Sequence, residues 1–106
     1  MKHFNELTPA EAERLALLLE EMGEAVQIIG KILRHGYESY HPDAPSVPNR
    51  ALLEKELGDV LAAIDMVVTA DDVNPEQIEG HRLNKHHKVG KYLHHQPTRK
   101  RVASST

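Results

Sequence analysis

The chain has 106 residues, enough for one small domain but too few for a large hydrophobic core. Hydrophobic residues make up 40% of it and aromatic residues only 4%, so the core must consist of aliphatic side chains, as is typical of helical proteins. The absence of cysteine excludes disulfides, thiolate metal sites and a cysteine nucleophile. A net charge of -3 is too small to favour or exclude a polyanionic partner.

The opening segment, MKHFNEL, lacks the apolar stretch of a secretory signal. No apolar run approaches the roughly 20 residues that a membrane-spanning helix needs. We therefore expect a cytoplasmic protein without a membrane partner.

The first predicted helix begins at a strong start signal. Thr8 and Glu11 can form a capping box around Pro9, which suits the first helical position. The helix should continue to residue 34 or 35, where Gly36 is a natural stop. Three prolines exclude a continuous helix over residues 37–48, so this segment is predicted to be a long loop.

Two more helices are predicted after this loop. Asn49 can cap a helix over residues 50 to 69 or 70, and Asn74 followed by Pro75 can start another that ends at residue 94 or 95. We expect these three helices to form one all-α domain over residues 1–97. Residues 98–106 are basic and polar and are predicted to be a flexible tail.

Four carboxylates fall in unusual positions when the helices are wound at about 100° per residue. Glu21 lies within the apolar arc of the first helix and Glu24 lies at its edge. Glu56 lies near the middle of the apolar arc of the second helix, and Asp59 lies beside it. Charges in such positions are unfavourable unless they are compensated.

A bound cation is the simplest compensation, because the nearby bases fall on or near the polar sides of the helices: Lys31, Arg34 and Lys55. Mg²⁺ prefers oxygen ligands and is commonly shared between carboxylates and substrate phosphates. The sequence therefore predicts a Mg²⁺ site, with Mn²⁺ as a possible substitute, formed by two carboxylates from each helix.

The segments LLLEEMGEAVQ and LLEKELGDVLAAID resemble the EExxE and ExxD motifs of the MazG-like all-α nucleotide pyrophosphohydrolases. The resemblance covers residues 15–93. It implies that Glu21, Glu24, Glu56 and Asp59 are both metal ligands and catalytic residues. It also implies Mg²⁺-dependent hydrolysis of a nucleoside triphosphate to a monophosphate and pyrophosphate, as in the removal of unwanted nucleotides. Glu20 matches the first acid of EExxE, but its position on the polar side indicates a role other than direct ligation.

Candidate substrate-binding residues lie outside the two motifs. The long loop carries Tyr37 and Tyr40, which could stack on a base or sugar, although a plain surface connector is an equally good interpretation. The resemblance further implies that Asn84, Lys85 and Lys88 on the third helix bind substrate. A solvated basic helix face explains the two lysines equally well.

Three other interpretations remain open. The chain could be a phosphoribosyl-ATP pyrophosphohydrolase, a non-enzymatic helical oligomer whose acids form salt bridges, or, least favoured, a nucleic-acid-binding protein. Apolar arcs of about 200° on the first two helices are too wide for one neighbouring helix to cover. We therefore expect a helical bundle completed by a homodimer or tetramer.

Overall fold

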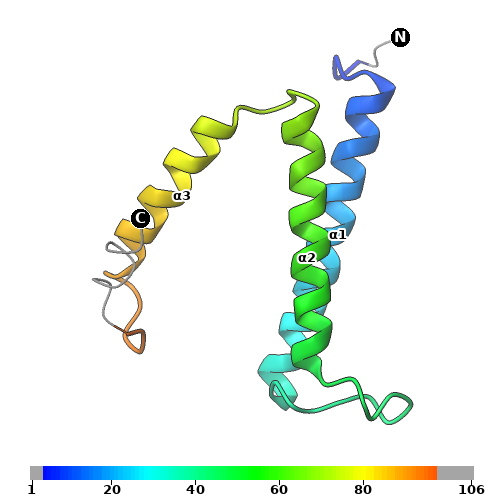
Figure 1. Ribbon diagram of the computed structural model, residues 1–106, viewed down its shortest axis with the longest axis vertical. Helices are drawn as coiled ribbons and strands as arrows, with labels where there is room; N and C mark the ends of the chain where they lie inside the picture. Colours follow the sequence, from blue (N-terminus) through cyan, green and yellow to red (C-terminus); the bar gives the residue numbers. More distant parts are fainter. Residues whose placement is uncertain (1–3, 98–106) are drawn as a thin grey trace. The chain divides into compact units, whose positions relative to one another are not determined.

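The computed structural model describes residues 4–97, which contain helices and connecting segments but no strand. The helices are α1 (Pro9–His35), α2 (Asn49–Thr69) and α3 (Pro75–Val89), as Figure 1 shows. This confirms the all-α prediction with three helices. The predicted tail lies outside the described residues, so its flexibility stays a prediction. Within the described part, no helix has both the length and the hydropathy needed to cross a membrane.

The chain divides into two compact units, Met1–Val73 and Asn74–Thr106. The first contains α1 and α2, and the second contains α3. That residues 1–97 act as one domain stays a prediction.

Helix α1 begins as predicted from the sequence. The Thr8 hydroxyl accepts a hydrogen bond from the Glu11 amide at 3.1 Å, and the Thr8 amide donates to the Glu11 carboxylate at 2.7 Å. At the other end Gly36 has a positive φ of 93° and its amide donates to the Ile32 carbonyl at 2.7 Å. Glycine reaches this φ without the steric penalty of a side chain, which explains why the helix stops there.

The predicted cap of α2 is wrong by one position. Pro48 is the residue before the helix, and Asn49 is its first helical residue, only 5% exposed. The Asn49 side chain instead donates to the Gly36 carbonyl at 3.3 Å, across the loop from the end of α1. A tertiary contact has therefore replaced the local cap that the sequence pattern favoured.

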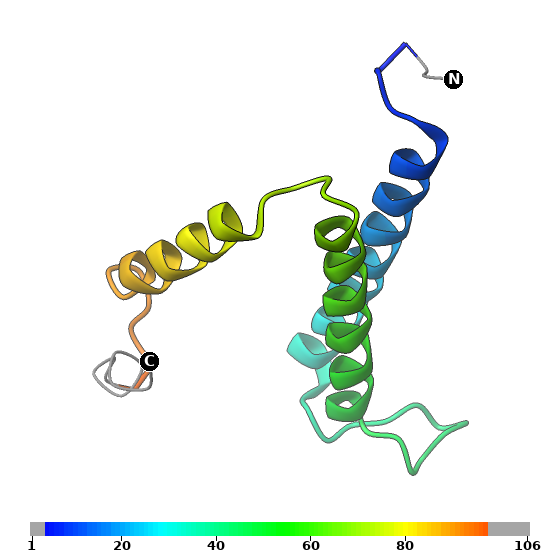
Figure 2. The same cartoon turned by 45° about the horizontal axis from the view of Figure 1, so that its top comes forward.

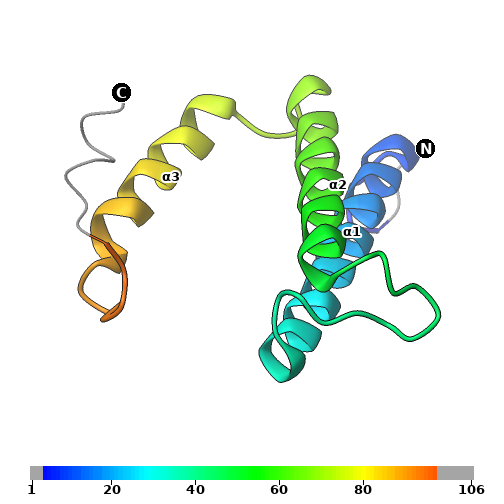
Figure 3. The same ribbon diagram turned by 60° about the horizontal axis from the view of Figure 1, so that its bottom comes forward.

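Helices α1 and α2 form an antiparallel hairpin (Figures 1 and 2). Its buried hydrophobic core is small and consists of Ala25 and Ile28 from α1 with Ala63 and Val67 from α2. The connecting loop extends from the end of the hairpin (Figure 3). Within it, Tyr40 and Pro48 pair through an isolated antiparallel β-bridge. The core places one face of each helix against the other and sets the position of their carboxylates.

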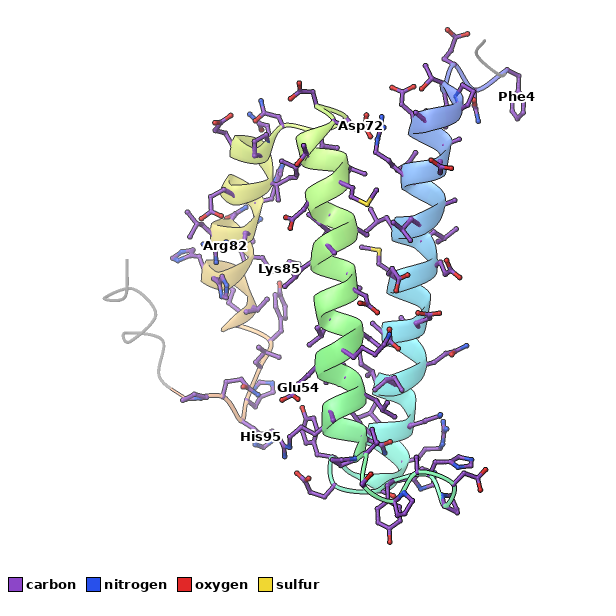
Figure 4. All side chains as sticks on the ribbon, turned by 45° about the vertical axis from the view of Figure 1, so that its right-hand side comes forward. Phe4, Glu54, Asp72, Arg82, Lys85 and His95 are labelled. Atoms are coloured by element: carbon purple, nitrogen blue, oxygen red, sulfur yellow. The ribbon has the colours of Figure 1, made fainter. Side chains whose placement is uncertain are left out.

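An ion pair closes the opposite end of the hairpin. Arg14 on α1 donates from Nε and Nη2 to the two carboxylate oxygens of Asp72, at 2.7 and 2.9 Å. Figure 4 shows Asp72 just beyond α2, next to α1. Both side chains are largely shielded from solvent, and two parallel hydrogen bonds fix their geometry.

This ion pair should make stability depend on acid pH. The hydrogen bond and charge of Arg14 lower the pKa of Asp72 below its ordinary value of 3.8. The ion pair therefore stabilises the fold fully at pH values above the ordinary pKa of 3.8, and this stabilisation is lost as the pH falls through the lower pKa of the folded state. We expect Asp72→Asn to unfold at a lower temperature at neutral pH and to lose less further stability than wild type on acidification. Thermal unfolding over this pH range measures it, with Asp71→Asn as the control, and identical acid sensitivity in wild type and Asp72→Asn would contradict it.

Helix α3 begins as predicted but ends earlier. The Asn74 side chain accepts hydrogen bonds from the amides of Glu76 and Gln77, and Pro75 is the first helical residue. The helix ends at Val89, whereas the sequence predicted residue 94 or 95. Gly90 follows directly, and glycine disfavours helix because it loses the most backbone freedom on ordering.

Candidate metal centre

The four predicted carboxylates converge between the helices of the hairpin. Glu21 and Glu24 come from α1, and Glu56 and Asp59 come from α2. One carboxylate oxygen from each residue lies within 4.8 Å of those of the other three. We call this group the carboxylate cluster. The spacing of three residues in each pair explains the arrangement, because it places both side chains on one side of a helix.

Two oxygens of the carboxylate cluster are buried without a hydrogen-bond partner in the structure: Oε1 of Glu21 and Oε1 of Glu56. The Glu56 side chain is only 13% exposed. Burial, together with the nearby charges of Glu24 and Asp59, raises the pKa of Glu21 above its ordinary value. The cluster is therefore short of hydrogen-bond donors and positive charge.

Lys55 supplies part of that positive charge, which the sequence analysis did not anticipate. Its Nζ lies 2.8 Å from Oδ2 of Asp59 and 3.9 Å from Oε1 of Glu56. The pairing follows from the spacing of four residues between Lys55 and Asp59, a signal that was present in the sequence. Among residues 4–97, Lys55 is the base paired with the carboxylate cluster, and one positive charge cannot balance four ionised acids.

The carboxylate cluster fits a hard divalent cation. Carboxylate oxygens are the ligands that Mg²⁺ prefers, and opposite ligands of its octahedron lie about 4.2 Å apart. Oxygens that already lie within 4.8 Å of one another reach such distances by small side-chain rotations. A cation would also give the buried oxygens of Glu21 and Glu56 the partner that they lack.

Replacing Glu21 by Gln should raise the stability of the metal-free protein and reduce the stabilisation that Mg²⁺ provides. Without metal, the variant should unfold at a higher temperature than wild type, because one of several repelling charges is gone. With excess Mg²⁺, wild type should gain more, because binding to the folded state stabilises it by mass action. Thermal unfolding in EDTA and in Mg²⁺ measures both effects. Glu13→Gln, on an exposed part of α1, is the matched control, and equal Mg²⁺ stabilisation of wild type and Glu21→Gln would exclude Glu21 as a ligand.

The candidate substrate-binding residues are distributed over both units. Tyr40 lines a pocket at the loop end of the hairpin. The ring of Tyr37 instead lies under the guanidinium of Arg50, whose Cζ is 4.4 Å from the ring centroid. Tyr37 is thus already stacked on a side chain of its own chain.

Asn84, Lys85 and Lys88 are exposed residues of α3, which belongs to the second unit. Figure 4 shows Lys85 on this helix. Their participation in substrate binding stays a prediction.

Comparisons with protein-family models, curated proteins and solved structures found no match to this chain.

Proposed function

We propose that this protein hydrolyses a nucleoside triphosphate to a nucleoside monophosphate and pyrophosphate, using Mg²⁺ bound by Glu21, Glu24, Glu56 and Asp59. The observation that supports it best is the convergence of these carboxylates, with two buried oxygens lacking hydrogen-bond partners. The resemblance of their two segments to EExxE and ExxD supports the choice of reaction.

In the proposed reaction, water adds to the α-phosphorus and the bond from that phosphorus to the α–β bridging oxygen breaks. Pyrophosphate leaves and the proton released from water passes to solvent. Mg²⁺, when bound, neutralises phosphate oxygens and makes water more acidic.

The residues of the chain hold this site in place. The antiparallel packing of α1 and α2 orients the four carboxylates toward one another before any ligand binds. Lys55 holds Asp59 by its 2.8 Å contact and orients that carboxylate. Such preorganisation is a general source of catalytic power.

A pyrophosphate-release screen tests this function. Purified protein is incubated with each of the eight common ribonucleoside and deoxyribonucleoside triphosphates and with phosphoribosyl-ATP, in Mg²⁺, in Mn²⁺ and in EDTA. The proposal expects metal-dependent release of pyrophosphate from at least one nucleoside triphosphate. Release from phosphoribosyl-ATP alone would favour that alternative substrate. No release from any of these compounds would favour the non-enzymatic oligomer.

We also propose that the hairpin self-associates. Six large apolar residues of α1 remain exposed, and they recur every three or four positions: Leu15, Leu19, Met22, Val26, Ile29 and Leu33. On α2, Leu57 and Leu61 are exposed as well. We call these eight side chains the apolar face. An exposed apolar surface of this regularity is typical of a helix that packs on a partner.

A further inference from the structure

A pocket of about 380 Å³ lies at the loop end of the hairpin. It is lined by residues from the end of α1, the connecting loop and the start of α2: Lys31, Arg34, His35, Ser39, Tyr40, His41, Pro42, Asn49 and Leu52. We call it the basic pocket. Its volume is in the range of small-molecule sites.

The lining of the basic pocket is suited to an anion. Lys31 and Arg34 contribute two positive charges, and no carboxylate is among the lining residues. Arginine and lysine are the usual partners of phosphate oxygens.

Of the acids next to the basic pocket, Glu38 contacts Nη2 of Arg50, which is not a lining residue, at 2.6 Å. The side chain of Asp43 is 91% exposed, so solvent screens its charge. Within the described part of the chain, neither carboxylate is paired with Lys31 or Arg34.

Two hydrogen bonds from the buried residue Asn49 hold the lining of the pocket in place. The Asn49 side chain donates to the Gly36 carbonyl at 3.3 Å, and its backbone amide donates to the Ser39 carbonyl at 2.8 Å. Asn49 thereby ties the end of α1 and the loop to the start of α2.

The basic pocket and the carboxylate cluster lie on one side of the hairpin. Lys31 follows Glu24 by seven residues, which is two helical turns on nearly the same face of α1. On α2, Leu52 precedes Glu56 by four residues, again on one face. Seven residues of helix span about 10 Å, which leaves room for a metal ion at the carboxylate cluster and for the two phosphates that follow the α-phosphate.

We propose that the basic pocket binds the terminal phosphates of a nucleoside triphosphate whose α-phosphate lies at the carboxylate cluster. The position of the α-phosphate at the carboxylate cluster rests on the proposed function. In this arrangement Lys31 and Arg34 neutralise the negative charges of the departing pyrophosphate. The arrangement also assigns Tyr40 a place beside phosphate, whereas the sequence predicted stacking on a base or sugar.

Binding of inorganic tripolyphosphate tests the basic pocket independently of catalysis. Titration calorimetry is carried out in EDTA, where the carboxylate cluster repels polyanions. We expect wild type to bind, and the double variant Lys31→Gln, Arg34→Gln to bind at least about tenfold more weakly, which corresponds to the loss of one charge-assisted hydrogen bond. Arg82→Gln with Lys91→Gln removes the same two charges from the second unit and is the matched control. Circular dichroism checks that all variants are folded.

Equal affinity of wild type and the Lys31, Arg34 variant for tripolyphosphate would overturn the proposal. Displacement of tripolyphosphate by a nucleoside that has no phosphate would also overturn it, because the base would then occupy the basic pocket. A third contrary result is tripolyphosphate that binds there without competing with Mg²⁺-nucleotide, which would indicate a separate effector site.

Phosphate binding in the basic pocket and hydrolysis at the carboxylate cluster can be refuted separately. Tripolyphosphate binding that depends on Lys31 and Arg34, and that nucleoside triphosphates displace without being hydrolysed, would support the phosphate site and refute the hydrolysis. Conversely, pyrophosphate release whose KM is unchanged in the Lys31, Arg34 variant would retain the hydrolysis and refute the phosphate site.

Discussion

The variant Glu56→Gln should release pyrophosphate at least about a hundredfold more slowly than wild type, because a lost metal ligand exceeds the 10- to 100-fold cost of mutating the groups that merely orient one. Glutamine has nearly the same shape as glutamate, so the hairpin should keep its helices. It lacks the negative charge, and Oε1 of Glu56 is one of the two buried oxygens without a hydrogen-bond partner. Pyrophosphate release at saturating nucleotide measures the loss of activity.

A matched variant and a binding measurement separate catalysis from folding in this experiment. Glu54→Gln removes the same charge from an exposed position two residues away on α2, and it should retain wild-type activity. Calorimetric titration with Mg²⁺ should show weaker binding by Glu56→Gln than by either wild type or Glu54→Gln. Full activity of Glu56→Gln would exclude the carboxylate cluster as the catalytic centre.

The helix ends show which parts of the fold local sequence can predict. The first helix is capped by Thr8 together with Glu11, and the third by the side chain of Asn74, which accepts from the amides of Glu76 and Gln77. All these contacts lie within four residues. Such contacts depend on the local chain alone, and both predictions are confirmed. Asn49 was predicted wrongly because its side chain bonds to Gly36, thirteen residues away, which a local pattern does not reveal.

The carboxylate cluster was predictable for a different reason. Helical phase places Glu21 and Glu56 within apolar arcs, and two arcs that pack together must bring such acids together. The basic pocket was not predicted, because it depends on how the loop returns from Gly36 to Asn49. Lys31 gave a partial signal through its spacing of seven residues from Glu24, but the loop conformation determines which groups lie opposite it.

The apolar face lies on the side of the hairpin opposite Glu24 and Asp59 of the carboxylate cluster. At about 100° per residue, the exposed row on α1 lies about 120° from the residues that contact α2. Leu57 and Leu61 lie about 120° from the residues of α2 that contact α1, in the same rotational sense. Because the helices are antiparallel, these rotations bring both rows to one side. Glu24 and Asp59 lie toward the other side, so a partner could cover the apolar face and leave the metal centre open.

A second copy of the chain is the partner that we expect on the apolar face, with a homodimer or a tetramer as the result. Leu19 is 74% exposed and Leu33 is 82% exposed, and burying a leucine side chain contributes about 2 kcal/mol. A symmetric dimer buries each position twice. The double variant Leu19→Gln, Leu33→Gln should therefore raise the dimer dissociation constant at least about a hundredfold.

Light scattering over a range of protein concentrations measures this change in self-association. Glutamine is uncharged, so the variant does not alter the electrostatics of the carboxylate cluster. Ala16→Gln places the same amide on the exposed polar side of α1 and should leave the assembly unchanged. Wild type should also show a thermal unfolding temperature that rises with concentration, because dissociation accompanies its unfolding. A wild-type protein that is monomeric at micromolar concentration would refute self-association through the apolar face.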